Sequence, residues 1–259
     1  MQSRMSSPNN QSILSKVPQI TAVFWATKIL TTGMGETTSD YLAHHMNPVI
    51  AVALGSIGLL VSLLLQFAVR RYVPWVYWLG VLMVSIFGTM AADVLHIGFG
   101  IPYVASSTFF AMILAIIFIV WYKSERSLSI HSIHTPRREI FYWATVLTTF
   151  ALGTATGDMT ATTMHLGYLD SGILFGIIFA VPAIGFWRFG FNPIAAFWFA
   201  YILTRPLGAS FADWLGVSHI RGGLGFGTGP VSFALLVLII GFVGYLAITH
   251  EDVEESPPH

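Results

Sequence analysis

Four aspartates recur within one sequence pattern, and they are the first candidates for chemistry in this chain. Each follows a tryptophan by fifteen residues and a glycine by five, so that every copy reads W-x9-G-x4-D. The copies are Trp25/Gly35/Asp40, Trp78/Gly88/Asp93, Trp143/Gly153/Asp158 and Trp198/Gly208/Asp213. Twelve fixed positions do not coincide by chance in a short chain, so the sequence contains a fourfold repeat.

The aspartates lie in an otherwise apolar chain. Only 9% of its 259 residues are charged, whereas soluble proteins carry about 25%. About twenty apolar residues cross the hydrocarbon core of a bilayer as a helix, and eight stretches of that kind are present. They are residues 18–42, 47–69, 74–97, 101–122, 139–163, 169–187, 192–215 and 229–249. The sequence therefore predicts an all-α polytopic membrane protein that contacts the lipid bilayer.

The repeat predicts how the eight helices are arranged. Each repeat is one helical hairpin, at about 17–70, 71–123, 137–189 and 190–249. Because a hairpin crosses the membrane twice, the four repeats have parallel orientations and are related by rotation about the membrane normal. The odd-numbered helices are expected near this pseudo-symmetry axis, with the more apolar even-numbered helices outside. The polar segments 1–16 and 250–259 are expected to be disordered cytoplasmic tails.

Basic residues predict the orientation, because Lys and Arg collect on the cytoplasmic side. One side holds Arg4, Lys16, Arg70, Arg71, Lys123, Arg126, Arg137, Arg138 and Arg188, and the other holds Arg221. Both termini are therefore expected in the cytoplasm, with the chain in a bacterial inner membrane. The net charge of +0 gives no reason to expect a nucleic-acid partner, and the absence of cysteine excludes disulfides and thiolate metal sites.

The aspartates have two interpretations. They could meet headgroups or cap turns at the membrane edge, or they could form a common ring, since acids inside a membrane typically mark ion or proton pathways. Glu36 adds a fifth acid, one turn before Asp40, and it occurs in the first repeat only. Carboxylates together with Thr hydroxyls suit hard cations, and mutual repulsion favours proton exchange. Glu36 is the first candidate for a coupling proton site.

Two bases, Lys28 and Arg205, lie within the predicted spans. Lys28 is more than two turns from Glu36 along the helix, so its carboxylate partner is expected from another repeat. Both bases could be pathway residues or internal counter-ions. Pro206 interrupts the hydrogen-bond ladder after Arg205 and predicts a kink.

Other repeated positions have structural and functional interpretations. Thr31, Thr149 and Thr204 share one position, where the hydroxyls could line a pathway or bond back to their own helix. The four repeat glycines could allow close helix contacts or open the backbone at a site. An aromatic residue precedes every repeat tryptophan, as expected for an interfacial belt. These aromatic residues are Phe24, Tyr77, Tyr142 and Phe197.

Histidines follow each aspartate within seven residues. They could form a metal-capturing crown, because imidazole binds divalent transition metals, or they could be ordinary loop residues. The residues are His44, His45, His96, His165 and His219. The glycine-rich segment "GGLGFGTGP" follows no strand and lacks a P-loop lysine, so it is interpreted as a flexible turn.

The segments "TKILTTGMGETTSDYL" and "VLTTFALGTATGDMTATTMHLGY" resemble a bacterial family of multi-pass membrane proteins built from a short repeat of unknown function. Its members are described as membrane-anchored proteins. The resemblance covers roughly residues 16–249, and it implies an architecture of repeated hairpins without implying an activity or catalytic residues.

The residues predict a secondary transporter or permease for a small cation, such as a divalent metal, coupled to protons. The pathway would contain the four aspartates, Glu36, Lys28, Arg205 and the three threonines. No cofactor is predicted beyond a bound divalent cation, and a homo-oligomer is left open. The alternatives are a membrane oxidoreductase, or haem or quinone protein, that uses the histidines, and a scaffold without transport activity.

Overall fold

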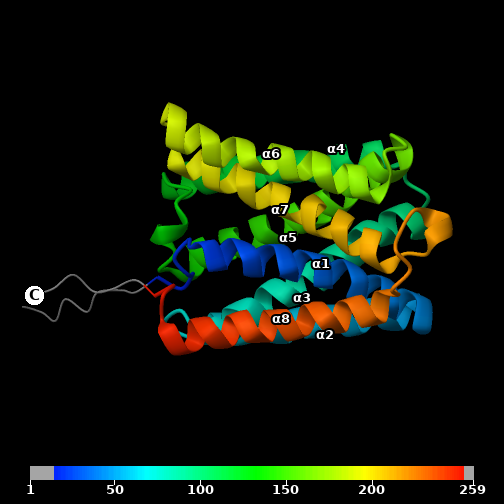
Figure 1. Ribbon diagram of the computed structural model, residues 1–259. Coiled ribbons are helices and arrows are strands. Elements are labelled where there is room, and N and C mark those ends of the chain that lie inside the picture. Colours follow the sequence, from blue (N-terminus) through cyan, green and yellow to red (C-terminus); the bar gives the residue numbers. More distant parts are fainter. Residues whose placement is uncertain (1–14, 254–259) are drawn as a thin grey trace, which may run out of the picture.

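The computed structural model describes residues 15–253, and within that range the chain is helical and contains no β-strand. Eight long helices follow one another along the chain (Figure 1). They are α1 (Ala22–His45), α2 (Pro48–Ala68), α3 (Pro74–Asp93), α4 (Tyr103–Glu125), α5 (Pro136–Asp158), α6 (Gly167–Phe189), α7 (Pro193–Gly216) and α8 (Thr228–Thr249).

The helix starts are written in the local sequence. Proline occupies the first turn of α2, α3, α5 and α7, where the missing N–H has no intrahelical partner to lose. The residue before α1, α2, α5 or α7 accepts a hydrogen bond from an N–H group of the first turn. These capping residues are Thr21, Asn47, Thr135 and Asn192.

Six helices are long and apolar enough to cross a membrane: α2, α3, α4, α6, α7 and α8. The two others, α1 and α5, are of similar length but carry most of the buried polar side chains. In α2, α4, α6 and α8 less than a third of the apolar window is buried inside the protein. The exposed apolar surface of these helices identifies a multi-pass membrane protein.

The odd-numbered helices form a closed ring. Helix α1 packs against α3, α3 against α5, α5 against α7, and α7 against α1. Each even-numbered helix covers the ring from outside, α2 on α3, α4 on α5, α6 on α7 and α8 on α1. The predicted arrangement of parallel hairpins around a pseudo-symmetry axis is confirmed.

The two ends of the bundle differ in charge. The end that holds residues 15–21 and 250–253 and the connections α2–α3, α4–α5 and α6–α7 is termed the basic face (Figure 1). The opposite end, which holds the other four connections, is termed the carboxylate face. The basic face carries Lys16, Arg70, Arg71, Lys123, Arg126, Arg137, Arg138 and Arg188, and the carboxylate face carries Arg221.

The expected interfacial aromatic belt is wrong. The aromatic residues before the repeat tryptophans are all buried, and three of the four tryptophans are buried with them. The rings interlock around the axis, because each aromatic contacts the tryptophan of the next repeat at a centroid distance of 5.6–6.2 Å. The pairs are Phe24–Trp78 at 5.6 Å, Tyr77–Trp143 at 5.8 Å, Tyr142–Trp198 at 6.2 Å and Phe197–Trp25 at 5.8 Å. Aromatic packing within the ring, rather than lipid anchoring, explains the repeat.

Parts of the two expected tails belong to the bundle. Lys16 is buried, and its Nζ lies 2.6 Å from Oε2 of Glu139 on α5. Gln66 on α2 donates to the other Glu139 oxygen over 3.2 Å. At the C-terminal end, Asp252 is buried and accepts a hydrogen bond from Tyr72. The other tail residues, 1–14 and 254–259, lie outside the described range.

Candidate functional site

The repeat glycines join the ring helices at contacts that leave no room for a side chain. A Cβ on Gly88 would lie 2.7 Å from Cβ of Phe150, and the other three glycines face a side chain of the next repeat even more closely. The successive contacts are Gly35–Ser85, Gly88–Phe150, Gly153–Arg205 and Gly208–Thr32. The prediction of glycine-mediated helix packing is therefore confirmed, and the contacts close a circle through all four repeats.

Side chains four residues apart on each ring helix form successive layers along the axis. In α1 this row is Phe24, Lys28, Thr32, Glu36 and Asp40. The first four layers are buried in every repeat. Only the last layer, the aspartates at the carboxylate face, is partly exposed. Polar access to the axis therefore comes from the carboxylate face.

Arg205 ties all four repeats together. Its guanidinium is completely buried and pairs with Glu36 of the first repeat. The same Nη2 atom donates to Thr89 Oγ1 of the second repeat and, over 2.7 Å, to Thr154 Oγ1 of the third. Nη1 donates over 2.8 Å to the carbonyl oxygen of Thr32. Arg205 is therefore an internal counter-ion for one carboxylate and the junction between the repeats.

The partners of Arg205 are equivalent positions in the repeat. Glu36, Thr89 and Thr154 all lie eleven residues after their repeat tryptophan, and Ala209 occupies this position in the fourth repeat. Three helices therefore present an oxygen to one cation at the same depth. Pseudo-symmetry supplies this geometry, because equivalent positions around an axis face the same centre.

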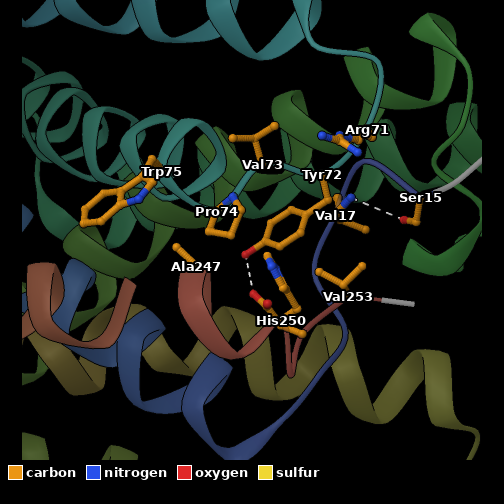
Figure 2. Close-up of a pocket in the computed structure, with 11 residues that line it drawn as sticks. Ser15, Val17, Arg71, Tyr72, Val73, Pro74, Trp75, Ala247, His250 and Val253 are labelled. Atoms are coloured by element: carbon orange, nitrogen blue, oxygen red, sulfur yellow. Dashed lines mark hydrogen bonds between the residues drawn. The ribbon is translucent and has the colours of Figure 1, made fainter. Parts of the chain in front are cut away.

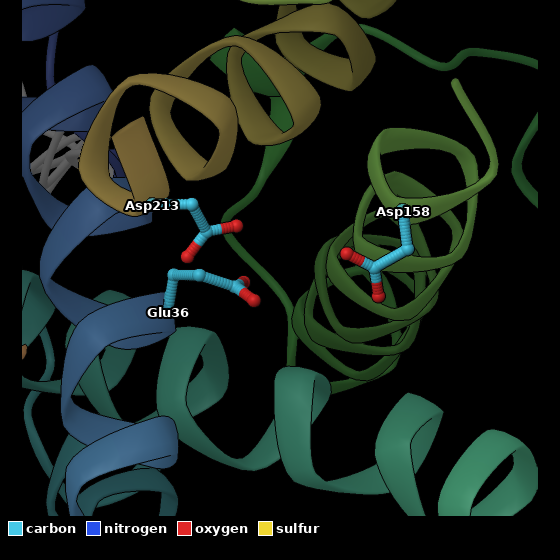
Figure 3. A group of neighbouring side chains, drawn as sticks. All are labelled: Glu36, Asp158 and Asp213. Atoms are coloured by element: carbon cyan, nitrogen blue, oxygen red, sulfur yellow. The ribbon is translucent and has the colours of Figure 1, made fainter. Parts of the chain in front are cut away.

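The carboxylates converge next to this junction. Oxygen atoms of Glu36, Asp158 and Asp213 all lie within 4.8 Å of one another, which is close enough to ligate one ion. Figure 3 shows the Glu36 and Asp213 side chains reaching towards each other, with the Asp158 carboxylate facing them from a separate helix. These three residues are termed the carboxylate cluster.

Asp40 and Asp93 lie at the rim of the carboxylate cluster. Both are half-buried, and both interact electrostatically with Glu36. All four repeat aspartates therefore share Glu36 as a charged neighbour, as expected for a common polar region.

The cluster has more negative than positive groups. Within residues 15–253, Arg205 pairs with Glu36, and none of the four repeat aspartates forms an ion pair with Lys or Arg. Asp213 is buried, and its Oδ1 atom has no hydrogen-bond partner in the described part of the chain. Burial of an uncompensated charge is very costly. The cluster must therefore hold protons or cations.

Two of the aspartates precede a widened helical turn. A π-helical turn spans Val94–Gly98 directly after Asp93, and another spans Met159–Thr163 directly after Asp158. Such turns are frequent at functional sites, because they shift the backbone relative to a regular helix. The fourfold symmetry is therefore broken at the carboxylate face.

The expected carboxylate partner of Lys28 is absent among the described residues. The Lys28 side chain is fully buried, and its Nζ atom has no hydrogen-bond partner there. It lies 3.7 Å from the ring centroid of Phe150 and 4.2 Å from that of Tyr201. Glu36 binds Arg205 instead, because the arginine lies one layer closer to it along the axis.

The axis is closed on the basic-face side of Arg205. Lys28, Phe150 and Tyr201 fill its centre with fully buried side chains, and the interlocked aromatic layer follows below them. Pro206 lies within α7, which continues as one helix from Pro193 to Gly216. No open passage connects the carboxylate cluster with the basic face.

The three threonines at the shared repeat position bond to their own helices. Thr31, Thr149 and Thr204 each donate to the carbonyl oxygen three residues earlier, over 2.8, 2.6 and 2.7 Å. This is the structural alternative. Thr89 and Thr154, which contact Arg205, are the threonines at the site.

The histidines lie apart from the carboxylate cluster. Among residues 15–253, the group of acidic or histidine side chains that could hold one ion contains no histidine. His44, His45 and His219 are exposed, and each ring contacts a carbonyl oxygen of its own segment. His165 is exposed with a positive φ, and His96 is buried against Ser106.

The glycine-rich segment is an ordered loop, so the expected flexible turn is wrong. Its N–H groups donate to the last carbonyls of α7, from Leu224 to Trp214 over 2.7 Å and from Gly227 to Gly216 over 3.0 Å. Glycine is required at residues 222, 225 and 227, where φ is between +71° and +86°. Arg221 of this loop donates to Tyr168 over 2.8 Å and acts electrostatically on Asp40 and Asp158.

The sequence left several contacts of the site unrecognised. Thr89 and Thr154 were visible only as the counterparts of Glu36. The signal that could have identified them is a polar residue at this position in three repeats, facing a single arginine in the fourth. Phe150 and Tyr201 carried no signal for their contact with Lys28.

Four consecutive segments of the chain match one family description, Repeat of Unknown Function (DUF347). The matched residues are 23–72, 76–127, 141–190 and 196–252. Neither the curated proteins nor the solved structures gave a match.

Proposed function

Because the chain belongs to the DUF347 repeat family, whose description names no activity, we propose its function from its own geometry: it is a proton-coupled secondary transporter for a small cation. The observation that carries this proposal is the carboxylate cluster, in which Glu36, Asp158 and Asp213 bring oxygens from three repeats within 4.8 Å. Four repeat aspartates without an ion pair in the described chain supply the negative charge that attracts cations.

The ligand chemistry favours a hard cation. The cluster offers carboxylate oxygens, and the hydroxyls of Thr89 and Thr154 lie on the opposite side of Arg205. Magnesium, calcium and manganese ions prefer oxygen ligands, whereas zinc and copper prefer nitrogen and sulfur. The proposed substrate is therefore a divalent ion of the first group, and protons are the competing ligand.

A carrier mechanism agrees with the closed axis. The carboxylate cluster is reached from the carboxylate face, and buried aromatic side chains block the axis towards the basic face. A carrier must open the blocked side after it closes the other. We propose that all eight helices span a cytoplasmic membrane, with the basic face in the cytoplasm, as the positive-inside rule favours.

The test is flux in proteoliposomes. Purified protein is reconstituted with a pH-sensitive dye inside, and magnesium, calcium, manganese, zinc, sodium and potassium are added in turn. The proposal expects uptake of at least one divalent ion with counter-movement of protons, and loss of this flux in Asp158→Asn/Asp213→Asn. Asp170→Asn, which alters an exposed aspartate of α6, is the matched control. Flux that is unchanged in the double variant would overturn the proposal.

A further inference from the structure

A second polar site lies at the basic face, remote from the carboxylate cluster. A cavity of about 440 Å³ is bounded by residues 15 and 17, by the α2–α3 connection with the start of α3, and by the end of α8 (Figure 2). This volume is within the range of small-molecule sites, about 300–1,000 Å³. The cavity belongs to no element of the proposed transport pathway.

The cavity has one positive and one negative group of suitable chemistry. Arg71 lines it with an exposed guanidinium that forms no ion pair among the described residues. Asp252 lines it with a carboxylate that is 1% exposed. Tyr72 donates to Oδ2 of Asp252, and Oδ1 has no partner in the described chain. An unpaired carboxylate oxygen that borders a cavity requires a donor from a ligand.

The surroundings connect the cavity with the lipid. Trp75 lines it and is 48% exposed at the start of α3, a position typical of residues that anchor in the membrane interface. Ile248, near the end of α8, is 82% exposed and offers apolar surface beside the opening. A ligand with a polar headgroup and apolar chains could therefore fill the cavity from the lipid side.

We propose that this cavity binds the headgroup of a phospholipid that carries both a phosphate and a primary ammonium group, as phosphatidylethanolamine does. The phosphate contacts Arg71, because a guanidinium pairs with phosphate oxygens in two parallel hydrogen bonds. The ammonium donates to the free Oδ1 of Asp252. The aromatic ring of Tyr72 and the indole of Trp75 favour a cation beside them.

The two charges decide between lipid classes. Phosphatidylcholine places three methyl groups on its nitrogen and cannot donate a hydrogen bond to Asp252. Phosphatidylglycerol has no cation, so its net negative charge would be repelled by the carboxylate. Anionic headgroups alone commonly bind basic pockets near the cytoplasmic side, but the buried Asp252 makes this pocket different.

The test is the thermal stability of the full chain in detergent, with each of the three lipids added to mixed micelles. Phosphatidylethanolamine is expected to raise Tm by about 3 °C or more above the other two lipids, because a ligand stabilises the folded state that binds it. Asp252→Asn should abolish the difference between phosphatidylethanolamine and phosphatidylcholine. Arg71→Gln should reduce the shift, whereas Arg70→Gln, an exposed neighbour outside the cavity, should leave it unchanged.

Further arms keep the test decisive. Tyr72→Phe removes the hydrogen bond to Asp252 but keeps the carboxylate, so it should retain the lipid preference even if its Tm is lower. Soluble phosphoethanolamine should give no shift at the same concentration, because it lacks acyl chains. An equal shift with phosphoethanolamine would identify a free zwitterion as the ligand and overturn the lipid assignment. Equal shifts with all three lipids would also overturn it.

Discussion

Arg205 and Glu36, from the fourth and first repeats, form an ion pair that is buried at the centre of the four-repeat ring. The arginine also donates to the threonines that occupy the Glu36 position in the second and third repeats. One guanidinium therefore satisfies three repeats at the same depth. Removal of either charge leaves the other without its partner in a region without water.

The ion pair predicts strong coupling between its two residues. Arg205→Gln and Glu36→Gln are each expected to lower the free energy of unfolding by about 3–5 kcal/mol, the cost of an uncompensated buried charge. The double variant should lose less than the sum of the two single losses, because it leaves neither charge behind. Thermal or denaturant unfolding in detergent measures all three. Additive losses would contradict a direct pair.

The glycine contacts predict a position-dependent effect of one methyl group. In Gly153→Ala the new Cβ would overlap Arg205 and lie 3.0 Å from Cδ of Pro206, so the free energy of unfolding should fall by about 1–3 kcal/mol. Gly241→Ala on α8 is the matched control, because no atom lies within 4 Å of its Cβ. The control should be neutral or slightly more stable, since alanine favours helices. Equal Tm values for the two variants would contradict the contact.

Lys28 predicts a gain of stability on removal of its amine. Lys28→Met keeps a long unbranched side chain between Phe150 and Tyr201 and removes a buried donor without a partner in the described chain. The free energy of unfolding should rise by about 1–3 kcal/mol, the cost of an unsatisfied buried group. Cation flux should fall if the amine has a role in transport. A lower Tm for this variant would show that Lys28 stabilises the bundle.

Asp252 predicts a pH dependence of stability. Burial raises the pKa of Asp252 above its usual value, while the hydrogen bond from Tyr72 acts in the opposite direction. The folded protein therefore keeps this proton at pH values where the unfolded chain has lost it. The contribution of Asp252 should be full below about pH 4 and should decrease as the pH rises through the folded pKa.

The comparison of Asp252→Asn with the unchanged chain isolates this effect. The variant should lose the part of the Tm decrease that Asp252 causes as the pH rises from about 4 to 7. Lipid-free detergent is used, so that no headgroup contacts the carboxylate. Parallel Tm profiles for both proteins would refute the assignment.

The sequence predicted the repeats and their axis because a period of about one hairpin is visible without coordinates. It also predicted that the glycines pack closely, since small residues at helix contacts in lipid have few other uses. It did not predict what each glycine meets. Gly153 lies ten residues after its tryptophan, whereas its neighbour Arg205 lies seven after its own. This stagger between adjacent helices is set by packing in three dimensions.

Lys28 shows where charge rules alone fail. Pairing with a carboxylate is the usual outcome for a base inside a membrane, but the layer spacing places Arg205 next to Glu36 and leaves Lys28 among aromatic rings. The aromatic residues before the tryptophans fail for a related reason. An interfacial belt and an interlocked ring of aromatics give the same sequence pattern, and only the depth of the helices distinguishes them.

Equilibrium binding of manganese to the purified protein tests the central claim most directly, because bound Mn²⁺ loses the six-line electron paramagnetic resonance signal of the free ion. The account predicts one bound ion per chain in the unchanged protein and in Asp170→Asn. It predicts affinity at least about tenfold weaker, roughly 1.4 kcal/mol, in each of Glu36→Gln, Asp158→Asn and Asp213→Asn. Affinities in these three variants equal to that of Asp170→Asn would show that the carboxylate cluster does not hold a cation.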